Sequence, residues 1–284
     1  MRSLRAIINI CLQDLRKWQR DHRILIIAIL LFLLVYDNVR SYRSISLSLN
    51  EPPSIWIYPF LYTQYHQKLV FTIPLLLLFS NAPFIDNNAV YVIARCRKSE
   101  WHLGQFLYIV ISSALYYIYI LLWSVILLLP FAELSTDWGR SLKTMAATSL
   151  TKEMGYDFLD IPAFTIIYFT PVQAMWFTFL LSFLMAVMLG TTIYFLNIIT
   201  NTRYIGSLVG SSIIIFSCFI ENFFTNSFAR RFSPVTWITV DKVDVGGLTH
   251  NPSFTYCVTF FISVSLILIA ATLILRKRIK LDIE

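Results

Sequence analysis

The feature that most constrains this chain is a series of long apolar runs that recurs along its whole length. A helix needs ~20 apolar residues to cross ~30 Å of hydrocarbon, and only helices or closed barrels satisfy their backbone hydrogen bonds there. Of the 284 residues, 57% are apolar and 14% are charged. The sequence therefore predicts an all-α, polytopic membrane protein that forms one transmembrane domain over residues 1–284. Hydropathy places six spans at residues 22–42, 64–85, 106–130, 173–196, 204–223 and 254–274.

The basic residues predict which ends of the spans face the cytoplasm, because Lys and Arg are enriched in short cytoplasmic segments. Placing both termini inside puts most of the 23 lysine and arginine residues on that side. We therefore expect a multi-pass protein of the cell membrane with both termini in the cytoplasm. The net charge of +7 then reflects topology and contact with anionic membrane lipid, and no nucleic acid is expected as a partner.

Residues 1–20 have the pattern of an amphipathic helix that precedes the first span. Charged residues occupy one face, and helical spacing gathers the opposite face from Leu4, Ile7, Ile8, Cys11, Leu12, Leu15 and Trp18. Such a helix lies in the membrane interface with its apolar face toward the lipid, like an elbow before the first span. The alternative is an amphipathic helix packed on a soluble domain, for which the chain has no candidate.

The loop at residues 86–105, between the second and third predicted spans, is a basic island in an apolar sequence. It could act only as a charged turn that orients the protein. It could also be a docking surface for a cytoplasmic protein, since Arg and aromatic side chains are enriched at interfaces. The candidate docking residues are Arg95, Arg97, Lys98, Glu100 and Trp101.

The layout resembles the ABC type-2 permease family. The resemblance covers nearly the whole chain and includes the amphipathic segment, the six spans and the R-x-x-x-W-x-x-G pattern at Arg97, Trp101 and Gly104. It also includes "FSPVTW" at residues 232–237 and the basic tail "RKRIKLDI" within residues 275–284. Family members often carry Lys where this chain has Gln105.

The resemblance implies a permease subunit of an ATP-driven exporter. Its partners would be a second permease subunit, which is the same or a homologous chain, and separate ABC ATPase subunits that push on the coupling loop at 86–105. The substrate would be amphipathic, such as a peptide, a drug or a lipid-like molecule, and it would move by alternating access. The rival hypothesis is a non-transporting polytopic protein, either a membrane enzyme or a sensor subunit.

The sequence contains no pattern that indicates chemistry within this chain. It has no G-x-x-x-x-G-K-[ST] motif for binding ATP, and its four histidines and four cysteines lack metal-ligand spacing. We therefore expect no catalytic residue, no metal and no cofactor here. ATP would be bound by the partner subunit.

Polar and aromatic residues at membrane depth are candidates for a substrate path. Gln64, Gln67 and Lys68 share one helical face at the outer start of the second predicted span, and such a face should point into the bundle. Lys68 could instead extend to the outer interface, or could pair with Glu221. Tyr117 in the third span could line a passage, although packing is the commoner role of such residues.

Gly206 and Gly210 predict a close helix contact along the fifth span, because small residues four apart let two backbones approach. The partner helix could belong to this chain or to a second subunit. Short external or re-entrant helices are expected in the two long outer loops, 131–172 and 224–253.

Overall fold

The computed structural model describes residues 2–84, 96–133, 135–148, 150–224, 227–247 and 249–275. Within these ranges the regular secondary structure is helical, and β pairing is limited to two isolated bridges, Ser54 with Glu133 and Asp244 with Ser253. The predicted all-α class is confirmed.

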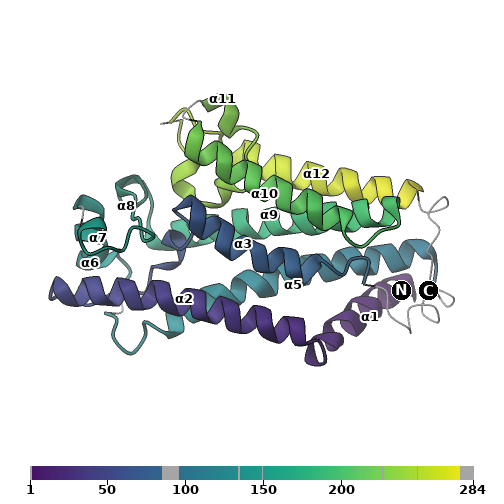
Figure 1. The fold of residues 1–284 in the computed structure, drawn as a ribbon, viewed down its shortest axis with the longest axis horizontal. Helices are drawn as coiled ribbons and strands as arrows, with labels where there is room; N and C mark the ends of the chain where they lie inside the picture. Colours follow the sequence, from purple (N-terminus) through teal and green to yellow (C-terminus); the bar gives the residue numbers. More distant parts are fainter. Residues whose placement is uncertain are drawn as a thin grey trace.

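Six long helices lie side by side along the long axis of the molecule, and successive ones run in opposite directions (Figure 1). Helix α9 is central, because it packs against α3, α5, α10 and α12, while α2 covers α3 and α5. A seventh helix, α1, which has the same length as α3, precedes them and lies against α5. Their bounds are α1 (Arg2–Arg16), α2 (His22–Ser48), α3 (Tyr65–Phe79), α5 (Lys98–Ile126), α9 (Pro171–Thr200), α10 (Ile205–Phe223) and α12 (Phe254–Leu275).

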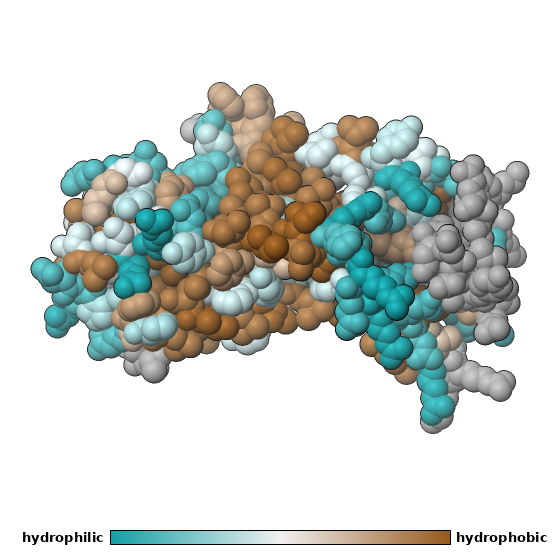
Figure 2. Space-filling view, turned by 60° about the horizontal axis from the view of Figure 1, so that its bottom comes forward, coloured by the Kyte–Doolittle hydropathy of each residue, from teal (hydrophilic) through white to brown (hydrophobic). Residues whose placement is uncertain are grey.

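Five of these helices, α2, α5, α9, α10 and α12, are long and apolar enough to cross a membrane. Their outward faces expose large apolar side chains that a soluble protein would bury, among them Leu25, Ile29, Leu33, Leu208, Phe216, Leu266 and Ile267. Figure 2 shows apolar surface across the middle of one face, with hydrophilic surface toward both ends. The chain is therefore a membrane protein.

The second predicted span, 64–85, is shorter than expected, so the prediction of six full spans is not confirmed. Helix α3 has 15 residues, which is about 22 Å of helix. It ends at Phe79 because Ser80 and Asn81 favour turns and Pro83 lacks the N–H that would continue the helix. Before α3, residues 53–63 form a mostly buried segment that contains the 3₁₀ turn Tyr58–Phe60.

The start of α5 corrects the boundary of the predicted coupling loop. We placed the third span at 106–130 and the loop at 86–105, but α5 already begins at Lys98. Residues 98–105 are therefore the first two turns of a long helix. Hydropathy missed them because their polar side chains lower the local average, whereas the helix needs only one apolar face there.

The two long outer loops contain short helices, as predicted. They are α6 (Gly139–Ala147), α7 (Leu150–Glu153), α8 (Ala163–Tyr168), α11 (Ser227–Arg230) and the 3₁₀ turns Thr236–Ile238 and Val240–Lys242. Figure 1 shows α6, α7 and α8 at the end of the bundle that lies farthest from α1. The predicted outer loops therefore lie at the end opposite α1 and the start of α5.

Candidate functional site

The first candidate site is the beginning of α5, which presents basic side chains at one end of the bundle. Arg97 and Lys98 are exposed there. The carboxylate of Glu100 accepts a hydrogen bond from the backbone N–H of Arg97 at 3.2 Å, and an acidic residue in the first turn also suits the helix dipole. Glu100 thus starts the helix. Arg95, the remaining basic candidate, lies outside the described residues together with 85–94.

Trp101 does not lie on the surface with the basic residues. Its side chain is 2% exposed, and its ring centroid lies 5.0 Å from that of His102 and 6.5 Å from that of Tyr194 on α9. The prediction that Trp101 contacts a partner directly is therefore at odds with its position. Because α5 begins three residues before Trp101, Trp101 is already helical, and helical spacing places it with Gly104 and Gln105 on the face that packs inward.

Helix α1 is held against this part of α5 by close backbone contact and by hydrogen bonds. A Cβ atom added to Gly104 would lie 2.7 Å from Cγ2 of Ile10, so only glycine allows the observed approach. Nε2 of Gln105 donates to Oδ2 of Asp14 at 2.7 Å, and Nζ of Lys17 lies 2.5 Å from Oδ1 of Asp14. We call the set Asp14, Trp101, Gly104, Gln105 and Tyr194 the basic-end junction.

The apolar residues of α1 divide between this junction and the outer surface. Cys11 is buried, and so is Ile10. Leu4, Ile8 and Leu12 remain exposed in a strip along the helix. Helix α1 is therefore amphipathic as predicted, but part of its apolar face serves the protein interior.

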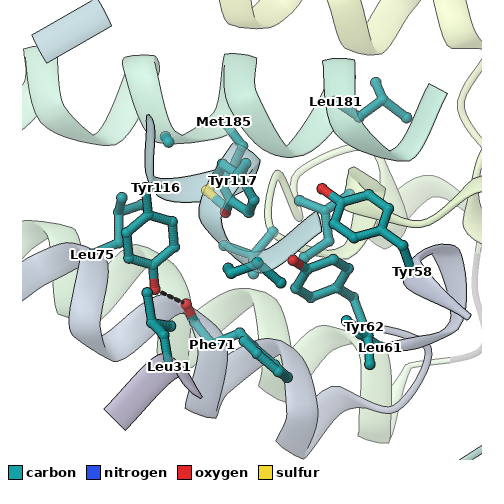
Figure 3. Packing of buried hydrophobic residues seen from close by; sticks show 14 of the residues in the cluster. Leu31, Tyr58, Leu61, Tyr62, Phe71, Leu75, Tyr116, Tyr117, Leu181 and Met185 are labelled. Carbon is teal, nitrogen blue, oxygen red and sulfur yellow. Dashed lines mark hydrogen bonds between the residues drawn. The ribbon is translucent and has the colours of Figure 1, made fainter. Parts of the chain in front are cut away.

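The second candidate site is a buried cluster of four tyrosines, Tyr58, Tyr62, Tyr116 and Tyr117, between α3, α5 and α9 (Figure 3). The hydroxyl of Tyr116 donates to the carbonyl oxygen of Phe71 at 2.6 Å. The hydroxyls of Tyr58 and Tyr62 are buried and form no hydrogen bond of ordinary geometry in the described part of the chain, although they lie near each other and the Tyr58 hydroxyl also lies near Ser182. Tyr117, a candidate for lining a passage, lies in this closed cluster with its ring centroid 6.3 Å from that of Tyr62.

Sequence reasoning missed Tyr58 and Tyr62, because they lie in the connection between the first two predicted spans. A signal was present in "IWIYPFLYTQ", residues 55–64, where apolar and aromatic residues outnumber polar ones. Exposed loops rarely carry such a run, so it indicated a segment that folds back into the protein.

The polar start of α3 points into the bundle, as predicted for Gln67 and Lys68. Both side chains are buried, and Nζ of Lys68 lies 2.6 Å from Oε1 of Glu221 on α10. Because Lys68 is 0% exposed, its ammonium group does not extend to the outer interface, and the alternative pairing with Glu221 is confirmed. Gln64 precedes the helix in an extended conformation and is half-buried.

Gly206 and Gly210 pack against helices of the same chain. A Cβ atom at Gly206 would lie 2.3 Å from the carbonyl oxygen of Ile193 on α9, and one at Gly210 would lie 3.0 Å from Cδ2 of Leu76 on α3. The backbone N–H of Gly206 donates to Oδ1 of Asn197 at 2.7 Å. The partner of this small-residue face is therefore α9, with α3 beside it.

Among the described residues, no group of three or more His, Cys, Asp or Glu side chains is placed to hold a metal ion. The four cysteines are free thiols.

Comparisons with protein-family models, curated proteins and solved structures find no match to this chain. The features of the molecule that bear on its function are the basic-end junction, the tyrosine cluster and helix α5, which connects them.

Proposed function

We propose that the chain is the permease subunit of an ATP-driven transporter, in which a separate ATPase subunit docks on the basic start of α5. The observation that carries the proposal is the path of α5. This one helix runs from Arg97 and Lys98 at the surface to Tyr116 and Tyr117 in the buried cluster. The 20 residues from Lys98 to Tyr117 span about 28 Å.

The basic-end junction makes α5 suitable for transmitting a push. Helix α1 contacts the first two turns of α5 at Gly104 and Gln105, and Tyr194 contacts them at Trp101. An unbroken helix does not compress. Displacement of Lys98 therefore moves Tyr116 and Tyr117, which belong to the same helix, relative to Tyr58 and Tyr62. In this mechanism Trp101 positions the docking end from within, and Arg97 and Lys98 provide the contacts to an acidic groove of the ATPase.

The tyrosine cluster is the proposed gate for an amphipathic substrate. Each tyrosine offers an apolar ring and a hydroxyl, which suits a molecule with both characters, such as a peptide, a drug or a lipid-like compound. The hydroxyls of Tyr58 and Tyr62 form no hydrogen bond of ordinary geometry in the closed state, which makes that state less stable than one in which both hydroxyls are fully hydrogen-bonded. Separation of α3 from α5 would let water or substrate satisfy them.

The proposed topology has six crossings, both termini in the cytoplasm and location in the cell membrane. Helix α3 runs opposite to α2 and α5 (Figure 1), and the buried segment 53–63 extends its path. Non-helical backbone is tolerated at membrane depth where protein surrounds it. We infer from the family resemblance that the substrate is exported and that the chain pairs with a second permease subunit.

Co-purification from cross-linked membranes tests this function. The tagged wild-type chain should recover an ATP-hydrolysing subunit of the ABC class, whose activity responds to added substrates. Reversal of the docking charges, Arg97→Glu with Lys98→Glu, should reduce this recovery about tenfold or more while membrane insertion persists, since opposed charges then become like charges.

The matched control reverses two basic residues at the other end of the bundle, Arg140→Glu with Lys143→Glu. Both side chains are exposed there, and ATPase recovery should stay at the wild-type level. Absence of any ABC ATPase from the wild-type sample would favour the rival function, a non-transporting membrane enzyme or sensor. Equal loss in both double variants would show that α5 is not the docking element.

A further inference from the structure

A polar cavity of about 250 Å³ lies where the end of α1, the start of α2 and the turn between α9 and α10 meet. Its charged lining comes from Asp14, Lys17, Asp21, Arg23 and Arg203. Aromatic walls are supplied by Trp18 and Tyr108, whose side chains are joined by a hydrogen bond from the indole Nε1 to the hydroxyl at 2.9 Å.

The charges of this cavity do not cancel. Asp14 is balanced by Lys17 and bonded by Gln105. Asp21 accepts the backbone N–H of Arg23 as the N-cap of α2, and the Arg23 guanidinium donates to the side-chain oxygen of Asn81. The ion pairs of the described residues include neither Arg23 nor Arg203. Two guanidinium groups thus line the cavity beside one carboxylate, Asp21, which leaves it positively charged.

An apolar groove of about 280 Å³ lies beside the polar cavity, and the two share Trp18, Ile24 and Leu78 as lining residues. The groove lies between α2 and α5, with Leu31 and Leu122 among its far lining residues. From Ile24 to Leu31 it follows α2 for about 10 Å. The two helices are joined beside it by a hydrogen bond from the Tyr119 hydroxyl to the Ala28 carbonyl at 3.0 Å.

We propose that this composite site binds one membrane phospholipid with an anionic headgroup. The phosphate lies between Arg23 and Arg203, since guanidinium groups form strong, charge-assisted hydrogen bonds to phosphate oxygens. The first part of an acyl chain lies in the groove between α2 and α5. Trp18 sits where polar cavity and groove join, as indole rings do at the boundary between headgroups and hydrocarbon.

A lipid fits better than a free phosphate ion because the groove lies beside the cavity and shares Trp18, Ile24 and Leu78 with it. A soluble ion would use the arginines alone and leave the groove unexplained. The exposed apolar face of α2, with Leu25 and Ile29, also places the groove where lipid chains are the surrounding solvent. The groove also borders Tyr116 of the tyrosine cluster, but the headgroup residues Arg23 and Arg203 belong neither to the docking end of α5 nor to that cluster, so their replacement tests the lipid site separately from the transport function.

Lipid retention and thermal unfolding of the purified full chain test the site. Native mass spectrometry should find one phosphatidylglycerol retained by the wild-type protein, and the melting temperature should be higher with phosphatidylglycerol than with phosphatidylcholine. Arg23→Gln with Arg203→Gln should weaken retention at least about tenfold, because a charged hydrogen bond contributes about 1.5–3 kcal/mol. The melting temperature in phosphatidylcholine should stay unchanged, which reports an intact fold.

Three single variants, measured for lipid retention in the same way, show whether the site itself is responsible. Arg203→Gln alone removes a cation that has no ion pair in the described structure and should weaken retention in part, even if the double variant does not fold. Arg140→Gln, at the other end of the bundle, should retain lipid like the wild type. Ala28→Phe fills the groove without changing a charge and should also reduce retention.

Glycerol phosphate, which has the headgroup chemistry but no chain, separates the two possible ligands. It should leave the melting temperature of the wild type unchanged. Stabilisation equal to that by phosphatidylglycerol would show a site for free phosphate compounds and overturn the lipid proposal. Unchanged lipid retention in both Arg203→Gln and Ala28→Phe would overturn it as well.

Discussion

Gly206 on α10 and Ile193 on α9 approach so closely that a methyl group on the glycine would lie 2.3 Å from the isoleucine carbonyl oxygen. Gly210, one turn further along α10, faces flexible side-chain ends instead, with Cδ2 of Leu76 at 3.0 Å and Cδ1 of Ile193 at 3.3 Å. The two glycines therefore differ in whether the atoms that face them can move aside to accommodate a methyl group.

We expect Gly206→Ala to destabilise the protein strongly and Gly210→Ala to have little effect. A backbone carbonyl cannot rotate away, so Gly206→Ala must displace α10 from α9 at a cost of about 1–3 kcal/mol or more. Thermal unfolding of the detergent-purified variants measures the difference. Equal melting temperatures would contradict the close helix contact.

Removal of one partner of the buried ion pair should be far more costly than removal of both. Lys68→Met leaves Glu221, which is 11% exposed, without its cation, and such a change typically costs about 3–5 kcal/mol. The double change Lys68→Met with Glu221→Gln should recover most of that loss, because no buried charge remains. Thermal unfolding of the three proteins measures the coupling.

The exposed pair between Lys143 and Asp137 provides the control for this measurement. Its side chains are 49% and 63% exposed, so Lys143→Met should change stability by less than about 1 kcal/mol. A double variant as unstable as Lys68→Met would mean that the two residues contribute through separate contacts.

The same chemical change, Tyr to Phe, should have opposite effects at two positions of the tyrosine cluster. Tyr116→Phe removes the hydrogen bond to the Phe71 carbonyl and should lower stability by about 1 kcal/mol. Tyr62→Phe removes a buried hydroxyl that finds no partner within the described chain, and should raise stability. Chemical denaturation or thermal unfolding shows whether each variant is more or less stable than the wild type. A loss of stability in both variants would contradict the assignment for Tyr62.

Cysteine labelling tests the sidedness of the bundle. In a Cys96→Ser background, an impermeant maleimide applied to intact cells should label Arg140→Cys, whose native side chain is 84% exposed, and spare Ser3→Cys. Buried Cys11 should stay silent, because burial and the charge of Asp14 raise the pKa of its thiol to about 11 and thiolate is the reactive form. Labelling of Ser3→Cys in sealed cells would overturn the proposed cytoplasmic N-terminus.

Much of the fold could be predicted from the sequence because lipid-facing helices need long apolar runs. The observed bounds of α9, α10 and α12 lie within a few residues of the predicted spans for this reason. The beginning of α5 could not be found in this way. There only the inward face, with Trp101 and Gly104, is packed, while Arg97 and Lys98 keep the average hydropathy low.

The candidate site was harder to predict than the spans, since it depends on which distant residues meet. Spacing placed Gln67 and Lys68 on one helical face and suggested Glu221 as a partner, because charges at membrane depth need one. No local pattern could show that Asp14 meets Gln105, or that Tyr58 and Tyr62 fold back beside Tyr117. These contacts depend on the packing of α1, α3 and α5, which are separate in the sequence.

The pairing of Lys68 with Glu221 has a consequence for biosynthesis. The two residues lie 153 positions apart, so α3 emerges from the ribosome long before its counter-charge exists. A lysine at membrane depth without a partner costs up to about 3 kcal/mol in translocon-dependent insertion, and α3 is the shortest helix of the bundle. In the proposed six-crossing topology, Lys68 therefore has no counter-charge until α10 has been synthesised, and membrane insertion of α3 is least favourable in chains that stop before Glu221.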